Sequence, residues 1–421
     1  MEKSLIKSLK SLKGNPKACV YTEPLWGLSM NLCLPYASVY MLALGLNDFQ
    51  VGITATIAML SQGVFAFLSG PITDKLGRRK TTAIFDFIGW CIPCIIWWRA
   101  EGFWFFAVAA TVNGIMQVTS NSWNCLLIED VEKSKVTTVN SLIMICGQLS
   151  VFFVPISAIL FSRLTLIPAI RILYINAFVV MTLKVVLLYI FSTETRMGAV
   201  RLEESRGKSL LSLASGYGPI VKIIFKSKGT VFALAVSIIV ATVGLVSTTF
   251  WPVIVTQKLL IPDYHLPFFL IIRSTVAIMF FFFVVPRLTK RFLKTPLLIG
   301  FVCLFIGMGV LILTPVEGPL RYVMLCVSLL FDGFGGAFLL MLAKSLVDLY
   351  VNPKERARVQ AILNMIILAA TSPFGWIGGM LSGISRELPF VLNLCILTVG
   401  FFVVLIYYRK NPQPDAPVHG A

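Results

Sequence analysis

Long apolar runs constrain the fold of this chain more than any other feature of its sequence. Of its 421 residues, 57% are apolar and only 13% are charged, which excludes ordinary soluble domains. A transmembrane helix needs about 20 mostly apolar residues to cross a bilayer. Twelve such runs lie at 22–46, 50–72, 80–98, 102–128, 137–163, 167–191, 229–255, 266–286, 296–315, 319–346, 357–382 and 388–408. We therefore predict an all-α integral membrane protein with twelve transmembrane helices.

The net charge of +17 is distributed unevenly between the two sides of the membrane. With an inner N-terminus, the outer loops carry only Arg99, Arg163, Lys258, Arg321 and Arg386, whereas most other Lys and Arg residues fall in inner segments. Inner loops rich in Lys and Arg are the usual determinant of membrane orientation. We predict a multi-pass protein of the cell (plasma) membrane with both termini in the cytoplasm. Because topology accounts for the positive charge, no nucleic-acid partner is indicated.

One long hydrophilic segment, 192–228, divides the twelve spans into six and six. Basic and acidic clusters recur at matching positions in the two halves, as expected for an internal structural repeat. The predicted parts are a cytoplasmic amphipathic segment (1–17), an N-terminal six-helix bundle (18–191), a central cytoplasmic loop (192–228), a C-terminal six-helix bundle (229–408) and a cytoplasmic tail (409–421). In the eleventh span, Gly375, Gly379 and Gly383 form a small-residue stripe that we expect to pack closely against another helix.

A charged turn, Gly70-Pro71-Ile72-Thr73-Asp74-Lys75-Leu76-Gly77-Arg78-Arg79-Lys80, joins the second and third spans. Its short length and its charge predict a tight, glycine-hinged loop at a membrane face. The pattern Gly70-x-x-x-Asp74-Lys75-x-Gly77-Arg78-Arg79 resembles the signature loop between helices two and three of the major facilitator superfamily (MFS). With twelve spans and a central loop, the resemblance covers nearly the whole chain and favours a bacterial-type twelve-helix member.

The resemblance implies two pseudo-symmetric six-helix bundles that alternate between inward-open and outward-open states. In relatives, the motif aspartate caps the eleventh helix and the motif arginine pairs with a carboxylate at the end of the fourth. Here that places Asp74 against the helix beginning near Arg356, and Arg78 against Glu129 or Asp130. The implied cytoplasmic gate consists of Gly70, Asp74, Gly77, Arg78, Arg79, Glu129 and Asp130. The alternative is a basic loop that only sets topology.

Polar side chains inside the spans indicate where a substrate could bind. In the fourth span, Asn113, Gln117, Asn121 and Asn124 recur on one helix face beside Trp123. Amides are costly in lipid unless partnered, so this face is predicted to line a cavity, although interhelical hydrogen bonding is the alternative. The predicted cavity residues are Asn31, Tyr36, Asn113, Gln117, Asn121, Trp123, Asn124, Arg273 and Asp332.

Charged residues inside spans are the candidates for ion coupling. Asp332 lies at the centre of the tenth span, and a carboxylate without a partner there would bind a proton near neutral pH. Asp86 is the second candidate for proton coupling, or a partner of the basic loop. Two alternatives stay open: a fixed ion pair between Asp332 and Arg273 of the eighth span that only joins two helices, and an Arg273 that faces the cavity and binds an anionic substrate.

These observations favour a secondary transporter that moves a small polar organic solute, preferably sugar-like, by symport or antiport with alternating access. The competing function is proton-coupled efflux of amphipathic drugs, although a basic residue in the fourth span and the glycine-rich run typical of such exporters in the fifth are both missing. A non-transporting substrate sensor is a further alternative. The sequence has no HExxH, metal-ligand cluster or nucleotide loop, so we predict no enzyme activity, cofactor or metal. The expected partners are the substrate, membrane lipid and protons, and the expected state is a monomer.

Overall fold

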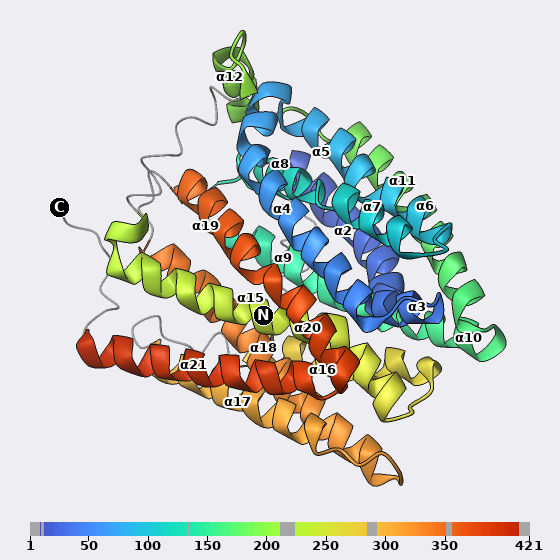
Figure 1. Cartoon of the computed structure of the whole chain (residues 1–421). Helices are drawn as coiled ribbons and strands as arrows, with labels where there is room; N and C mark the ends of the chain where they lie inside the picture. The colour runs from blue at the N-terminus through green and yellow to red at the C-terminus, as the bar shows by residue number, and fades with distance from the viewer. Residues whose placement is uncertain are drawn as a thin grey trace. The chain divides into compact units, whose positions relative to one another are not determined.

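The structure, a computed structural model, describes residue 9 and residues 12–132, 135–210, 224–283, 293–350 and 356–411, and within these ranges every regular element is helical (Figure 1). The first helices are α2 (Gly14–Cys33), α3 (Ala37–Ala43), α4 (Asp48–Leu76), α5 (Arg78–Asp86), α6 (Ile92–Trp98), α7 (Phe103–Asn113), α8 (Met116–Ile128), α9 (Val136–Leu149), α10 (Pro155–Arg163), α11 (Leu166–Phe191) and α12 (Arg196–Glu204). They are followed by α15 (Lys228–Val253), α16 (Leu266–Phe283), α17 (Lys294–Ile312), α18 (Leu320–Tyr350), α19 (Arg356–Thr371), α20 (Pro373–Ile384) and α21 (Leu388–Lys410).

Eleven helical runs in the described ranges are long and apolar enough to cross a membrane, and they correspond to the second to twelfth predicted spans. The first predicted span is also helical, over α2, a 3-10 turn at Leu34–Tyr36 and α3. Its helix α2 is more polar than the other runs, since it carries Lys17, Glu23 and Asn31. The all-helical membrane fold predicted from the apolar runs is therefore confirmed.

The described residues form two compact units, which are treated separately below. Unit 1 comprises Met1–Tyr36 and Ile57–Tyr217, and unit 2 comprises Ala37–Thr56 and Gly218–Ala421. Unit 2 thus takes the start of α4, which the predicted N-terminal bundle included. The predicted central loop contains a helix, α12, and most of the predicted segments 1–17 and 409–421 lies outside the described residues.

In unit 1, α11 packs along α2, α5 packs against α8, and α6 packs against both α7 and α11. Apolar side chains from α2, α8, α9 and α11 form one buried cluster that includes Leu126, Leu127 and Leu188. Leu9 and Leu12 pack against this cluster, so the chain entering α2 already covers the core of unit 1.

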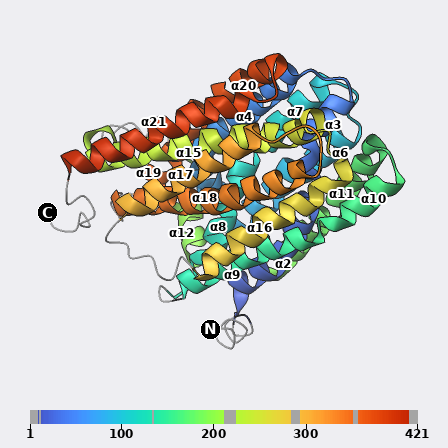
Figure 2. The same cartoon turned by 90° about the horizontal axis from the view of Figure 1, so that it is seen from below.

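In unit 2, α15, α17, α18 and α21 run alongside one another in both views (Figures 1 and 2). Their core is rich in large apolar side chains, among them Phe301 and Leu339, both almost completely buried.

The predicted glycine stripe of the eleventh span packs against the start of α4, also within unit 2. A Cβ atom on Gly379 would lie 2.6 Å from the Asp48 carbonyl oxygen, and one on Gly52 would lie 2.4 Å from the Gly375 carbonyl oxygen. The packing role predicted for Gly375 and Gly379 is therefore confirmed. The prediction is wrong for Gly383, because a Cβ there would meet nothing within 4 Å.

Candidate functional site

The turn between α4 and α5 is a single residue. α4 continues as helix through Gly70 and Asp74 to Leu76, and α5 begins at Arg78. Gly77 has φ of +81°, a conformation that favours glycine, and a Cβ atom there would lie 2.6 Å from a Glu194 carboxylate oxygen. The predicted glycine hinge is therefore present at Gly77, but the turn is shorter than predicted, since Gly70 and Asp74 lie inside the unbroken helix α4.

Arg78 is the centre of an ion-pair network in unit 1. Its side chain is 5% exposed, and its Nε donates to both Glu129 carboxylate oxygens at 3.2 Å. Nη2 lies 3.1 Å from Glu129 Oε1, and Nη1 lies 2.9 Å from Asp74 Oδ1. Of the two expected partners, Arg78 binds Glu129, while Asp130 is exposed and accepts the Arg196 backbone N–H at 3.3 Å. The contact expected between Asp74 and the helix near Arg356 stays a prediction.

Glu194 completes this network, and the sequence analysis missed it. Its carboxylate accepts the backbone N–H groups of Arg78 at 2.9 Å and of Arg79 at 3.1 Å. These are free donors at the start of α5, where a negative charge also interacts favourably with the helix dipole. The Thr195 hydroxyl donates to Glu129 and accepts from the Gly198 N–H, which caps α12. The feature of the sequence that could have revealed Glu194 is its position as an acidic residue just after the sixth span, in a mostly basic segment.

Arg79 makes a different set of contacts. Its guanidinium donates to the Tyr189 carbonyl oxygen at 2.8 and 3.1 Å and lies 4.2 Å from the centre of the Tyr189 ring. Arg79 therefore ties the start of α5 to the end of α11.

The predicted amide stripe of the fourth span is mostly engaged by protein. Asn113 donates to the Gly89 carbonyl oxygen at 2.8 Å, in the π-helical turn Phe87–Cys91. Gln117 donates to the Gln62 side chain at 3.1 Å, and Asn121 donates to the Thr73 hydroxyl at 3.3 Å. These are the interhelical contacts that the sequence analysis gave as the alternative.

The remaining predicted cavity residues of unit 1 are dispersed. Asn124 is exposed, and Asn31 is half-buried. Tyr36 is completely buried, with its hydroxyl 2.9 Å from the Ser157 hydroxyl and its ring packed on Phe161. The prediction that Tyr36 faces a cavity is therefore wrong. The Trp123 indole nitrogen is buried and has no hydrogen-bond partner among the described residues.

Asp86 is paired with a lysine that the sequence analysis did not match to it. The Lys184 ammonium, from α11, donates to the Asp86 carboxylate, and both side chains are less than 5% exposed. Glu23 of α2 interacts electrostatically with both. The suggestion that Asp86 is a partner of the basic loop is therefore wrong, because its charge is balanced inside the membrane span.

Asp332 and Arg273 form an ion pair in unit 2. Arg273 Nε lies 2.9 Å from Asp332 Oδ2, and the two side chains are 34% and 15% exposed. They line a small pocket together with Ser247, Trp251, Gly307, Met308, Leu311, Ser328 and Phe390. The room inside is about 10 Å³, enough for about one water molecule. The ion pair is the arrangement that the sequence analysis weighed against a free, proton-binding carboxylate.

Comparison with protein families identifies one family, and comparison with solved structures shows one fold. A profile of the Major Facilitator Superfamily matches residues 25–322 and 272–421. No curated protein sequence matches this chain.

Among solved structures, a mutant of the nucleoside transporter NupG has a TM-score of 0.75 at 15% identity, over 94% of this chain and 100% of that one. A mutant of the peptide transporter POT has a TM-score of 0.70 at 13% identity, over 98% of each chain. The human organic anion transporter MFSD10 has a TM-score of 0.60 at 15% identity, over 92% of this chain and 98% of that one.

Proposed function

This chain belongs to the Major Facilitator Superfamily, and we propose that it transports a small polar organic solute, sugar-like in its hydroxyl groups, by alternating access. The observation that carries the proposal is the Arg273–Asp332 pair, which lines a pocket within the membrane spans of unit 2. Charges inside membrane spans are expensive and usually serve a transport pathway. The pair offers both hydrogen-bond donors and acceptors, as a hydroxyl group requires.

The amides of unit 1 support the preference for a solute with hydroxyl groups. Asn113, Gln117 and Asn121 each use an N–H donor in the contacts above. A carboxamide oxygen has two lone pairs, and all three side chains are half-buried. Their oxygens therefore keep capacity to accept from substrate hydroxyl groups.

For coupling, we propose Asp332 as the proton carrier. A substrate that binds Arg273 competes with Asp332 for the guanidinium. A carboxylate that loses its cation in a poorly solvated site is neutralised by a proton more readily than left charged. Substrate and proton would then be bound by the same event, as symport requires.

The Arg78 network is proposed as the gate on the predicted cytoplasmic side. It joins α4, α5, α8 and the start of α12 through charge-assisted hydrogen bonds. The hydrogen bonds of such a network are either formed or broken, so their formation can shift the equilibrium between two conformational states that differ by a few kcal/mol.

A second candidate substrate is a nucleoside. The Trp251 ring lines the pocket beside the ion pair and packs edge-on against Phe269. An aromatic face stacks on a nucleobase with about 1–3 kcal/mol, and the ribose would supply hydroxyl groups. NupG, which has the same fold, is a nucleoside transporter.

The test is uptake of radiolabelled sugars and nucleosides into proteoliposomes, with and without a protonophore. We expect saturable uptake of one class that falls when the proton gradient is removed. Arg273→Lys and Asp332→Asn should each lower uptake at least tenfold, whereas Arg409→Lys, at the end of α21, should not change it. Transport of dyes without sugar or nucleoside would favour drug efflux. Substrate binding without any flux would favour a sensor.

A further inference from the structure

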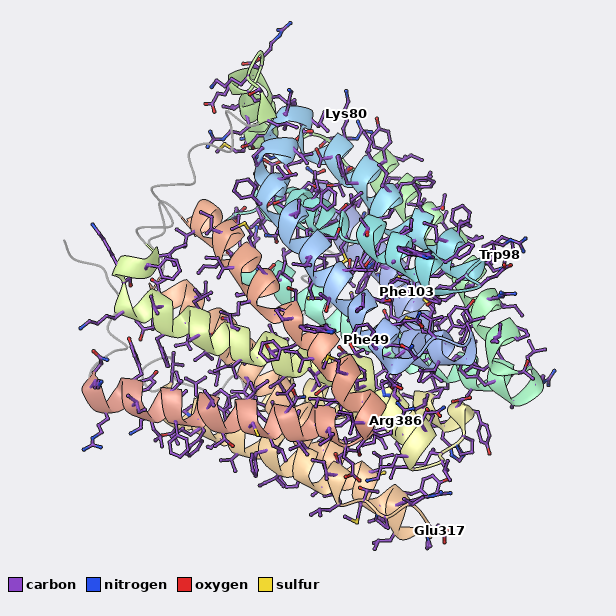
Figure 3. All side chains as sticks on the ribbon, viewed as in Figure 1. Phe49, Lys80, Trp98, Phe103, Glu317 and Arg386 are labelled. Carbon is purple, nitrogen blue, oxygen red and sulfur yellow. The ribbon has the colours of Figure 1, made fainter. Side chains whose placement is uncertain are left out.

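A groove runs along the surface of unit 1 between the helical run from α5 to α6 and the helix α11. Figure 3 labels Lys80 and Trp98 at the two ends of that run. The groove has a volume of about 550 Å³ and is lined by Lys80, Ala83, Ile84, Phe87, Ile88, Val185, Val186, Tyr189 and Ile190. We call it the α5–α11 groove. None of its residues belongs to the pocket proposed for substrate.

The groove has apolar walls and is open to the outside of unit 1. Ile84, Phe87, Val186, Tyr189 and Ile190 are each between 37% and 60% exposed. All five lie in helices long and apolar enough to span the membrane. In a bilayer these side chains therefore face the hydrocarbon chains of the lipids.

The length of the groove limits its occupant to one leaflet. From Lys80 to Ile88, eight residue-to-residue steps along the helical run rise by roughly 12 Å. This is less than half of the hydrocarbon core, which is about 30 Å thick. An acyl chain that enters beside Lys80 would therefore end before the middle of the membrane.

The end of the groove beside Lys80 is cationic. Lys80 is exposed and forms no ion pair with any described residue, and no carboxylate lines the groove. The guanidinium of Arg79 is already held by the Tyr189 carbonyl oxygen and ring, so the Lys80 ammonium is the group left to bind an anion. Lys80 lies two residues after the start of the membrane-spanning run Arg78–Trp98, where we expect the lipid head groups.

We infer that the α5–α11 groove binds an anionic glycerophospholipid, with an acyl chain along the groove and the phosphate at Lys80. The lipid would cover Tyr189, which holds Arg79, and the backbone N–H of Arg79 is bound by Glu194. A bound lipid thereby supports the contacts that join α5, α11 and the Arg78 network. The inference depends on membrane insertion and is independent of the identity of the transported solute.

The test uses the full chain in nanodiscs that contain photoreactive acyl-chain probes of phosphatidylglycerol or phosphatidylcholine, with labelled peptides identified by mass spectrometry. We expect the phosphatidylglycerol probe to label residues 185–190 about fivefold more than the phosphatidylcholine probe, the preference of one surface lysine for anionic lipid. Lys80→Gln should bring the two probes to equal labelling. Lys75→Gln removes an exposed lysine outside the groove and should leave the preference intact.

Two results would overturn the inference. One is equal labelling of residues 185–190 by both probes in the unaltered protein, which would indicate ordinary bilayer contact. The other is an equal loss of preference in Lys75→Gln and Lys80→Gln, which would indicate diffuse attraction to the basic turn. Val186→Trp, which fills the groove, should lower labelling by both probes, and unchanged labelling would also count against the groove.

Discussion

Replacement of Glu129 by glutamine should destabilise unit 1 more than replacement of Asp74, the other carboxylate that pairs with the Arg78 guanidinium. Glu129 receives three hydrogen bonds from Arg78 and one from Thr195. Arg78 is almost completely buried, so its guanidinium cannot be hydrated in place of the lost carboxylate. The substitution keeps the size of the side chain and removes its charge.

The magnitude follows from burial. Breaking a buried ion pair costs about 3–5 kcal/mol because the remaining charge is uncompensated. Asp74 stays 2.9 Å from Arg78, and the glutamine oxygen still accepts one hydrogen bond, so we expect a loss of about 2 kcal/mol. That is a factor of about 30 in the unfolding equilibrium. Asp74 is 36% exposed, and the loss of such an exposed partner costs about 0.2–1 kcal/mol.

Equilibrium unfolding in mixed micelles, followed by circular dichroism, measures these differences. The matched control is Asp130→Asn, because the adjacent Asp130 is exposed and accepts only one backbone N–H. In a double-mutant cycle, Glu129→Gln with Arg78→Gln should cost clearly less than the sum of the two single changes. If Glu129→Gln is no more destabilising than Asp130→Asn, the network does not act as a buried ion pair and our reasoning fails.

Three further predictions concern other contacts. Gly379→Ala should lower the free energy of unfolding by about 1–3 kcal/mol, since its Cβ would strike the backbone of α4. Gly383→Ala, whose Cβ would lie in open space, should leave the free energy of unfolding unchanged. Thermal unfolding measures both variants. Lys184→Met should lower the free energy of unfolding by about 3–5 kcal/mol because it leaves Asp86 buried and unpaired. In denaturant unfolding, the double variant Lys184→Met with Asp86→Leu should recover most of this loss. Asp74→Asn should shift the resting population toward the inward-open state, and cysteine labelling from the cytoplasmic side would be unchanged if Asp74 has no role in the gate.

The partners of the charged residues could be predicted only in part. Arg78 and Glu129 were paired because the turn matches a known motif, and the structure has them in contact. Glu194 was missed because its role is to bind backbone N–H groups more than 100 residues earlier in the chain, and no side-chain pattern records a backbone donor. Lys184 was not matched to Asp86, since helical periodicity relates residues of one helix and not residues of α5 and α11.

The sequence by itself determined the membrane location, the helical runs and the family resemblance, because a bilayer selects for apolar length and each helix satisfies its own backbone hydrogen bonds. The tertiary structure alone decided how the polar groups inside those helices are used. It placed Asp332 against Arg273, engaged Asn113, Gln117 and Asn121 with neighbouring helices, and buried Tyr36 in packing. The physical reason is that a polar group in hydrocarbon must find a partner, and which partner lies within about 3 Å depends on helix packing that the periodicity of one helix does not encode.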